Sequence, residues 1–510
     1  MSETLTTTDT KEDKTNTSFQ FKTHRFTVTV EGGSEVSDIE VQFNETGLNL
    51  VYGSNDEKDK NILYENILSC EQQSITADSG TLCLHVYESV EGSCCSDPAR
   101  RYHTVHFTAR TDAAKELKIA IDKAINFNIR SFLVLVNPAS GDGSAVSVWE
   151  SVQAMFTQAQ HKVEVIKTTH AGHASDYVKT MPLDKYDSIA IVSGDGLMYE
   201  VVNGLMQRQD WRLALETLSL GLIPGGSGNG SAKSVCSLSQ QLYSVSHVAF
   251  IIAKGQTRKM DMYSVRQEEE ELQFGVLCVS WGLISDIDSN SEKWRCCGGF
   301  RFIPGAIAGI CCLNTYQASI SYLLQESPAQ QDESLSFQNQ PSNTTDLTTT
   351  TCCPGCPCIS GDDNELDALE ALVTLHHRTS SQNNEEEKLT ESKEVCWQNL
   401  DEVFSLVWLL NLPDPASDFH AGPYTHSSNG AMDLVYSTEA NCCSLMGQLP
   451  SVASGEYIDS NSVETLRVKA IRLTPAPVAK TSLIMADGEA LPQKPTTIEV
   501  FRKILNTFCF

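Results

Sequence analysis

The pattern of hydrophobic residues changes near Arg130, and from there to about Thr257 short apolar runs alternate with longer segments of helical periodicity. Short apolar runs are typical of buried strands, and their alternation with amphipathic helices predicts a mostly parallel sheet flanked by helices. We therefore expect residues 129–257 to form one α/β domain. The expected strands are 132–136, 163–166, 189–192 and 218–223.

A different pattern precedes this domain. In residues 19–128, short stretches rich in β-branched and aromatic residues follow one another, and residues 111–125 carry hydrophobic side chains at helical spacing. Several strands followed by one amphipathic helix predict a small β module of the pleckstrin-homology-like kind. Such a module can dock on phosphoinositides or serve as a structural appendage, and no dense basic loop favours docking. Residues 1–18 are polar, and we expect them to be disordered.

After the α/β domain the chain again becomes rich in predicted strands. Residues 258–325 and 395–510 predict a second, antiparallel β-rich domain. Residues 326–394 are mostly polar and acidic, so we expect a disordered insertion that buries too little apolar surface to fold. The insertion contains the thiol cluster Cys352–Cys358, which could bind zinc or accept acyl chains. No second cluster completes a zinc site, so incidental clustering is the simpler interpretation.

Composition and charge limit the classes of partner. The 510-residue chain has 37 Lys and Arg against 65 Asp and Glu, a formal net charge of −28. Nucleic acid is therefore not expected as a partner, because phosphate binding needs clustered basic residues. The apolar runs are shorter than the ~18–20 residues of a membrane-spanning helix, so any membrane contact should be peripheral. Without a signal-like stretch, the 18 cysteines are interpreted as reduced thiols of a cytoplasmic protein.

Three glycine-bearing turns follow predicted strands of the α/β domain, at 137–143, 193–196 and 224–230. At the carboxyl ends of parallel strands such turns converge, and glycine lets backbone amides approach phosphate oxygens beside a helix N-terminus. One such turn would more often be structural, but three in sheet order indicate a phosphate site. Neither a P-loop nor a complete dinucleotide-binding fingerprint occurs at a strand end, so another phosphate-binding arrangement is required.

Asp195 stands between Gly194 and Gly196, after one predicted strand and before a helix that begins near Leu197. A carboxylate in this place can simply cap the helix. It can also accept the proton of an attacking alcohol, or help to place magnesium beside bound phosphates. Asp195 is therefore the candidate catalytic residue.

The run Ser193-Gly-Asp-Gly-Leu-Met-Tyr-Glu-Val-Val-Asn-Gly204 resembles the signature of sphingosine kinases, within the diacylglycerol kinase catalytic-domain family. Other family signatures follow in the same order, among them Asn137-Pro138, Pro224–Asn229, Trp281–Asp288 and Asp487–Glu489. The resemblance implies an α/β nucleotide domain followed by a β-rich lipid-binding domain, with ATP and Mg²⁺ in the cleft between them. It also implies transfer of the ATP γ-phosphate to the primary hydroxyl of a sphingoid base, with Asp195 as general base.

The same resemblance implies the binding residues. ATP would be surrounded by Asn137, Pro138, Ala139, Thr168, Thr169, His170, Ala171, Gly172, Gly194, Gly196, Glu200, Gly226, Ser227, Gly228, Arg295, Arg301, Asp487, Gly488 and Glu489. The lipid would contact Ser193, Gly194, Asp195, Gly196 and Asp288. Asp288 would pair with the amine of the sphingoid base and present the neighbouring hydroxyl to Asp195. A loop carboxylate without this role is the alternative, and no metal site made by the protein alone is expected.

Three positions depart from the family pattern. Ala139 and Ala171 stand where some members carry arginine, and Asp142 replaces a common lysine. We expect weaker nucleotide binding from this thinner positive charge, although a catalytically silent lipid-binding scaffold stays open as an alternative. Ceramide and diacylglycerol kinases are the alternatives among enzymes, since ceramide kinases share a similar N-terminal module and a related cysteine cluster. Leu197 and Met198 favour a sphingosine kinase, which would associate transiently with membranes to reach its substrate.

Overall fold

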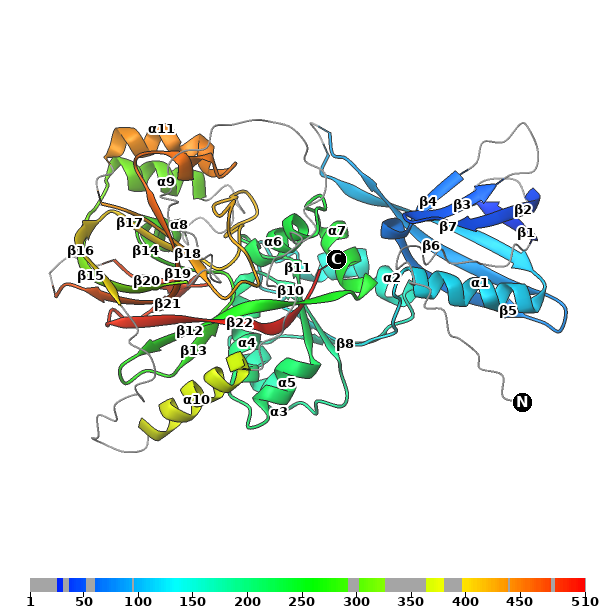
Figure 1. The fold of residues 1–510 in the computed structure, drawn as a ribbon, viewed down its shortest axis with the longest axis horizontal. Helices are drawn as coiled ribbons and strands as arrows, with labels where there is room; N and C mark the ends of the chain where they lie inside the picture. The colour runs from blue at the N-terminus through cyan, green and yellow to red at the C-terminus, as the bar shows by residue number, and fades with distance from the viewer. Residues whose placement is uncertain are drawn as a thin grey trace, which may run out of the picture. The chain divides into compact units, whose positions relative to one another are not determined.

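The computed structural model describes residues 25–30, 36–51, 60–93, 96–291, 302–325, 364–379, 397–438, 441–477 and 482–509. The chain divides into two compact units (Figure 1), one made of Met1–Glu88 with Arg101–Phe127 and the other of Ser89–Arg100 with Asn128–Phe510. Residues 1–18, the Cys352–Cys358 cluster, and the predicted ATP contacts Arg295 and Arg301 lie outside the described residues.

The first unit is built on a seven-stranded sheet in the order β4-β3-β2-β1-β7-β6-β5. The strands are β1 (Arg25–Val30), β2 (Val36–Phe43), β3 (Gly47–Val51), β4 (Lys60–Leu63), β5 (Ile67–Ile75), β6 (Gly80–Val90) and β7 (Ala99–Ala109), with the short 3-10 helix η1 (Tyr64–Asn66) before β5. The helix α1 (Thr111–Ala124) follows and buries Ala114, Leu117 and Ile121 in the core of the sheet. The expected antiparallel sheet with one closing helix is present.

The second unit begins with the predicted parallel sheet, whose strands run in the order β9-β8-β10-β11. All residues of β10 and β11 are buried, which explains why they appear in the sequence as continuous apolar runs. The strands are β8 (Ser131–Val136), β9 (Lys162–Lys167), β10 (Ser188–Ser193) and β11 (Ser219–Pro224). The helices are α2 (Ala145–Gln158), α3 (His173–Thr180), α4 (Asp195–Met206), α5 (Trp211–Thr217), α6 (Gly230–Leu238) and α7 (Val245–Lys254).

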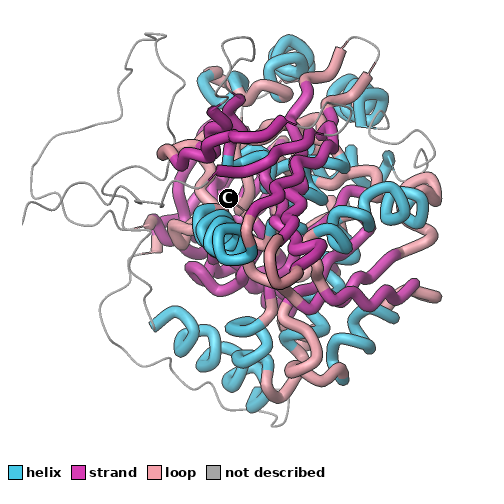
Figure 2. The backbone as a smooth tube through the Cα atoms, turned by 90° about the vertical axis from the view of Figure 1, so that its right-hand side faces the viewer, coloured by secondary structure: helices cyan, strands magenta, loops and turns pink. Residues whose placement is uncertain are grey.

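The last strand of the chain joins this parallel sheet to the β-rich part. The end of β22 (Thr496–Phe508) pairs parallel with β11, where Ser219 lies opposite Asn506. The rest of β22 pairs antiparallel with β12 (Thr257–Gln267) and β19 (Glu464–Pro475). The result is one mixed 15-stranded sheet, and Figure 2 shows the strands of the chain in magenta. The sequence predicted both halves but not this continuity.

The β-rich part is antiparallel, as expected. Its other strands are β13 (Gln273–Gly275), β14 (Cys278–Gly282), β15 (Tyr316–Leu324), β16 (Gln398–Phe404), β17 (Leu406–Leu410), β18 (Met432–Ser437), β20 (Ile484–Ala486) and β21 (Glu489–Leu491). It also contains the helices α8 (Leu283–Ser291), α9 (Phe302–Cys311) and α11 (Cys442–Val452), and the 3-10 helix η4 (Glu456–Asp459). The three α-helices pack together through Leu283, Ile310 and Leu445. In the described part of the chain, no helix is long and apolar enough to cross a membrane.

The stretch 326–394, expected to be disordered, contains a folded helix, α10 (Asn364–Thr379), so that expectation is wrong for these residues. Three contacts explain why α10 is folded. Leu369 is fully buried, and the Arg212 Nη1 atom lies 2.8 Å from the Asp367 Oδ1 atom. The Lys469 Nζ atom also donates to Glu365 at 2.9 Å. Composition alone could not reveal α10, because its docking surface comes from distant segments.

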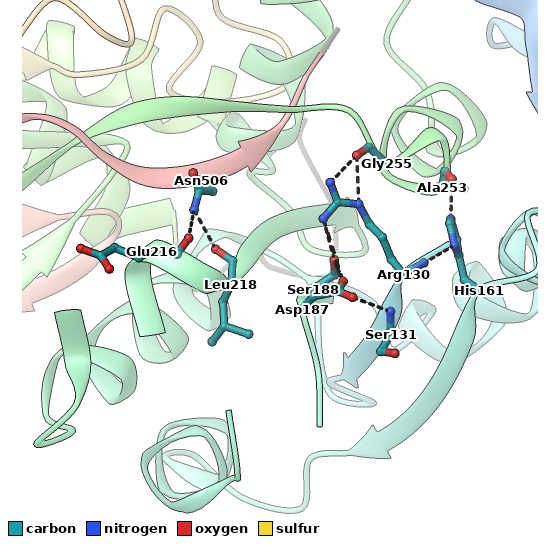
Figure 3. A network of polar contacts seen from close by, with 10 residues as sticks. All are labelled: Arg130, Ser131, His161, Asp187, Ser188, Glu216, Leu218, Ala253, Gly255 and Asn506. Atoms are coloured by element: carbon teal, nitrogen blue, oxygen red, sulfur yellow. Dashed lines mark hydrogen bonds and ion pairs between the residues drawn. The ribbon is translucent and has the colours of Figure 1, made fainter. Parts of the chain in front are cut away.

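A polar network closes the amino-terminal edge of the parallel sheet (Figure 3). The Arg130 guanidinium donates to the Gly255 carbonyl at 2.7 Å. The His161 Nδ1 atom accepts from the Arg130 amide at 3.1 Å, so the Nε2–H group donates to the Ala253 carbonyl at 2.7 Å. Burial lowers the pKa of His161, consistent with a neutral ring. These groups hold the parallel sheet to the end of α7 at its amino-terminal edge. The candidate site lies at the opposite edge, where the strands have their carboxyl ends.

Candidate active site

A cavity of about 760 Å³ opens at the carboxyl ends of β8, β10 and β11. The three predicted glycine turns line one end of it. The other end is lined mostly by apolar residues of the β-rich part, among them Leu283, Ile284, Ile287, Leu406, Trp408, Leu449 and Val463. The cavity therefore has one wall suited to phosphates and another suited to a hydrocarbon chain.

The glycine turns meet backbone against backbone. A Cβ atom added to Gly226 would lie 2.4 Å from the Gly194 Cα atom. A Cβ atom on Gly141, whose φ is +59°, would lie 3.0 Å from the Gly225 carbonyl oxygen. Glycine is needed at these contacts because any larger residue would push the turns apart. The predicted convergence of the three turns is thus present.

Asn229 closes the third turn. It adopts a left-handed conformation, with φ at 58°, and its side-chain amide both accepts from Gly226 N at 2.9 Å and donates to Gly226 O at 2.7 Å. The Ser417 amide, from the segment that follows β17, donates to the Gly228 carbonyl at 2.8 Å. The predicted binding residues of this turn end at Gly228 and do not include Asn229, which holds the turn in place. The Gly-Asn pair before a helix was the available signal, since Asn tolerates this conformation.

Asp195 lies at the first position of α4, facing the N-terminus of α6. Its Oδ2 atom accepts from the Gly230 amide and its Oδ1 atom from the Ser231 amide, each at 2.9 Å. Burial raises the pKa of Asp195, while the two amide hydrogen bonds act in the opposite direction. The structure therefore presents a well-oriented carboxylate whose proton affinity is increased by its surroundings.

Two further carboxylates lie beside it. A Cβ atom on Gly196 would lie 2.9 Å from the Glu489 Oε1 atom, so Glu489 reaches from β21 to the start of α4. The Glu200 Oε1 atom accepts from the Ala174 and Ser175 amides at 2.8 and 3.1 Å, which caps α3. Glu200 lines the cavity and also fixes the start of α3, so its place in the structure has a structural reason.

Asp487 and Gly488 form the tight turn between β20 and β21, and their φ angles are 49° and 85°. Positive φ at both central residues is typical of a type I′ hairpin turn. The Asp487 carboxylate is 3% exposed and accepts from three consecutive amides, those of Val276, Leu277 and Cys278, at 2.7 to 2.9 Å. Burial raises the pKa of Asp487 to about 6. Both carboxylate oxygens of Asp487 therefore hold residues 276–278 in place through hydrogen bonds.

Asp288 lies on α8 and lines the cavity together with Leu283, Ile284 and Ile287 of the same helix. The buried thiol of Cys278 lies within electrostatic range of both Asp288 and Asp195, and burial followed by nearby carboxylates raises its pKa. Asp286, two residues earlier, lies on a different face of the same helix: it accepts from Tyr316 at 2.6 Å and from Ser482 at 2.8 Å. Of these two acidic residues, only Asp288 lines the cavity.

The other residues predicted to bind ATP or lipid either line the cavity or do not. Those that also line the cavity are Asn137, Pro138, Ala139, Thr168, Thr169, His170, Ala171, Ser193, Gly194, Gly226, Ser227, Gly228 and Gly488. Gly172 does not line it but starts α3 with φ at 87°. No lysine or arginine is among the described residues that line the cavity. The two predicted cationic contacts, Arg295 and Arg301, lie outside the described residues.

Helical residues at the apolar end were not predicted. Ala306 and Ile310 of α9, and Leu445, Gln448, Leu449 and Val452 of α11, line the cavity. The sequence placed these segments in a β-rich domain and indicated no helix there, because apolar runs this short have no clear helical period. These residues line one cavity because α9 and α11, which are far apart in the sequence, are in contact in the fold.

Comparison with known proteins agrees with this geometry. Residues 131–265 match the diacylglycerol kinase catalytic domain, and residues 417–509 match the YegS C-terminal NAD kinase β-sandwich-like domain. Sphingosine kinase 1 of Arabidopsis thaliana is 30% identical over 430 residues, covering 82% of this chain and 81% of that protein. Sphingosine kinase 2 of the same plant is 29% identical and covers 74% of this chain and 73% of its own length.

A mammalian relative matches a shorter part. Sphingosine kinase 1 of Mus musculus is 36% identical over 197 residues, which is 38% of this chain and 51% of the mouse protein. The plant alignment extends over most of both chains, so it includes the β-rich part as well as the glycine turns. The chain belongs to the sphingosine kinase family.

Proposed function

We propose that this protein transfers the γ-phosphoryl group of ATP to the primary hydroxyl of a sphingoid base, giving a sphingoid 1-phosphate. The observation that carries the proposal is that Asp195 lines the same cavity as the three glycine turns and the apolar side chains of the β-rich part. ATP would lie against the three glycine turns and the lipid tail against the helical wall. The acceptor hydroxyl would then come next to Asp195.

Asp195 acts as the general base in this proposal. Its amide partners from α6 fix the direction of the carboxylate, and each oxygen has a second lone pair for the substrate hydroxyl. The raised pKa of Asp195 favours acceptance of the hydroxyl proton as the oxygen attacks phosphorus. The amides of the glycine turns would stabilise the developing charge on the phosphoryl oxygens.

Magnesium fits this site as a companion of the nucleotide. Within the described ranges no group of three or more His, Cys, Asp or Glu side chains could hold a metal ion. A phosphate-bound Mg²⁺ would need at most one or two carboxylates, and Asp195 and Glu489 lie at the polar end. When bound, the ion supplies positive charge that the described lining lacks. Arg295 and Arg301 are proposed as the protein's own cationic contacts, on the family resemblance alone.

Asp288 is proposed to select the substrate. A carboxylate in the same cavity as Asp195 can pair with the ammonium group of a sphingoid base, which lies next to the primary hydroxyl. Ceramide and diacylglycerol carry no such cation. We also propose that the N-terminal sheet is pleckstrin-homology-like and that the protein contacts membranes peripherally, since its substrate resides in a bilayer.

The test is transfer of radiolabelled γ-phosphate from ATP to sphingosine, ceramide and diacylglycerol in parallel, with the intact chain and its Asp195→Asn variant. Label on sphingosine that falls by a factor of about 10²–10⁴ in the variant supports the proposal. Thermal unfolding of both proteins shows whether the variant keeps its fold. Label on ceramide or diacylglycerol instead would reassign the substrate, and no label with any lipid would reject the proposed activity.

A further inference from the structure

Asn203 belongs to the signature run 193–204, and the proposed reaction gives it no task. It lies on α4, about two helical turns after Asp195, and is half-buried. Its Oδ1 atom accepts from the Phe274 amide at 2.9 Å, and its Nδ2 atom donates to the Phe274 carbonyl at 2.8 Å. The Nδ2 atom also donates to the Tyr199 carbonyl at 2.8 Å. One side chain thus pairs with both backbone groups of Phe274.

These bonds join two parts of the second unit. The helix α4 follows a strand of the parallel sheet, whereas Phe274 lies on β13, which pairs with β12 in the antiparallel part. Phe274 is buried, so water competes little for the bonds to its backbone. The Tyr199 hydroxyl donates to the Gln273 side chain and adds a second polar contact between the same two elements. The helix is therefore fixed to β13 by side chains from two of its turns.

The two ends of α4 are held by different parts of the protein. At its start, the Asp195 carboxylate accepts from the Gly230 and Ser231 amides, which belong to α6 of the α/β part. Toward its end, Asn203 is bonded to β13 of the β-rich part. A helix of 12 residues keeps its shape when it tilts, so the attachment at Asn203 helps to fix where Asp195 stands relative to the β-rich part.

The strand β13 leads directly into the cavity wall that the β-rich part supplies. The amides of residues 276–278, which follow shortly after Phe274, donate to the Asp487 carboxylate at 2.7 to 2.9 Å. Asp487 lines the cavity, and so do the last two of these residues. The bonds between Asn203 and Phe274 therefore link the helix that carries Asp195 to this wall by a short stretch of chain.

We propose that Asn203 is a positioning residue, which holds the helix that carries Asp195 at a fixed separation from the cavity wall of the β-rich part. This role rests on the proposed function, in which the nucleotide lies against the glycine turns and the lipid against apolar side chains of the β-rich part. Without the bonds to Phe274, each substrate would keep its own contacts, but the acceptor hydroxyl would be less well aligned with Asp195 and the γ-phosphate. A misplacement of about 1 Å can lower a rate about 10²-fold.

Misalignment and lost binding can be told apart by kinetics. Removal of a contact that binds substrate raises KM, whereas removal of an interaction that aligns the reacting groups lowers kcat. In an Asn203→Ala variant we expect kcat with sphingosine to fall about 10- to 100-fold. The dissociation constants of ATP with magnesium and of sphingosine, each measured alone, should stay unchanged.

Asn506 provides a matched control, because its side chain makes a comparable bridge at another place. The Nδ2 atom donates to the Leu215 and Glu216 carbonyls at 2.9 and 3.2 Å, which joins the end of α5 to β22 (Figure 3). None of the described residues that line the cavity belongs to α5 or β22. Asn506→Ala should therefore lower the melting temperature without changing kcat.

Asn203→Asp is a second variant, which keeps the size of the side chain. Its carboxylate can still accept from the Phe274 amide, but it donates nothing and sets a negative charge against the Phe274 and Tyr199 carbonyls. The fall in kcat should therefore occur in this variant as well, even if Asn203→Ala unfolds.

The experiment compares the full wild-type chain with these three variants. It measures kcat with radiolabelled ATP and sphingosine, the affinity for each substrate alone, thermal unfolding, and hydrogen exchange of the amides of residues 276–278. Both Asn203 variants should combine a lowered kcat and faster exchange of these amides with unchanged substrate affinities. Asn506→Ala should match the wild type in kcat and in the exchange of the same amides.

Unchanged kcat in both Asn203 variants would overturn the inference, and so would an equal fall in Asn506→Ala, since a general loss of stability would then explain the effect. Weaker binding of either substrate alone would also overturn it, because Asn203 would then act on binding. If the wild-type chain binds both substrates but phosphorylates no lipid, the proposed function fails. Hydrogen exchange then decides the role of Asn203: faster exchange at residues 276–278 in the Asn203 variants alone supports it, and unchanged exchange overturns it.

Discussion

Gly226 and Gly194 touch through their backbones, because a Cβ atom on Gly226 would lie only 2.4 Å from the Gly194 Cα atom. The two residues come from turns after different strands, β11 and β10, which pair in parallel register. Their contact brings the third glycine turn against the residue that precedes Asp195. The geometry of the proposed phosphate wall and that of the general base are thus coupled.

Substitution of Gly226 should separate this wall from Asp195. In a Gly226→Ala variant the new methyl group cannot fit without backbone movement, so we expect a loss of nucleotide affinity of tenfold or more, about 1.4 kcal/mol. Titration of the protein with ATP and magnesium measures this directly. Gly447→Ala is the matched control, since a Cβ atom there meets nothing within 4 Å. Equal ATP affinity in both variants would contradict the role given to the Gly226 contact.

The two acidic residues of α8 should differ in what their loss changes. Asp288→Asn removes a charge that faces the cavity, so we expect the KM for sphingosine to rise about 10- to 100-fold, as charge-assisted hydrogen bonds contribute roughly 1.5–3 kcal/mol. The KM for ATP should stay the same. Asp286→Asn instead weakens bonds to Tyr316 and Ser482, so it should lower the melting temperature more than it changes lipid preference. Steady-state kinetics and thermal unfolding of both variants test this division, and a reversed pattern would contradict it.

The buried His247 should make stability fall in mild acid. Its side chain is held between the Ser89 and Ser244 hydroxyls at 2.9 and 2.8 Å, and burial, assisted by Arg100, lowers its pKa to about 4. The unfolded chain takes up a proton near the ordinary pKa of 6.5, while the folded chain does not. The stabilising contribution is therefore present above pH 6.5 and is lost as the pH falls toward 4, by roughly 2–3 kcal/mol.

Denaturant unfolding between pH 4.5 and 8 measures this dependence. A His247→Gln variant keeps a neutral polar side chain but cannot titrate, so its free energy of unfolding should decline less steeply in acid than that of the wild type. Parallel curves for the two proteins would show that His247 does not contribute to the pH dependence.

The docking of α10 should depend on its apolar contacts more than on its ion pairs. Arg212 is partly exposed, and pairs of this kind contribute about 0–1 kcal/mol, so Arg212→Ala should weaken docking slightly. Leu369 is fully buried, and Leu369→Ala should cost about 2–5 kcal/mol. Hydrogen exchange of the α10 amides should show a large loss of protection in the second variant and a small one in the first. High salt should mimic only the first.

The sequence alone determined the architecture of the α/β part and the chemistry of its turns. Two of its strands, β10 and β11, are buried along their whole length, so their apolar runs are unambiguous, and glycine at a crowded turn has few substitutes. The run around Asp195 was specific enough to identify the family from local residues. For this reason the sequence alone predicted the convergence of the turns and a site at the strand ends.

Tertiary structure decided everything that depends on segments far apart in the chain. The joining of both halves through β22, the folding of α10 within a polar stretch, and the helical wall of the cavity all arise from contacts between distant residues. The same holds for Asp487, whose carboxylate accepts from the amides of Val276, Leu277 and Cys278, about 210 residues earlier in the chain. Periodicity reports which face of an element is apolar, but not which distant surface will cover that face.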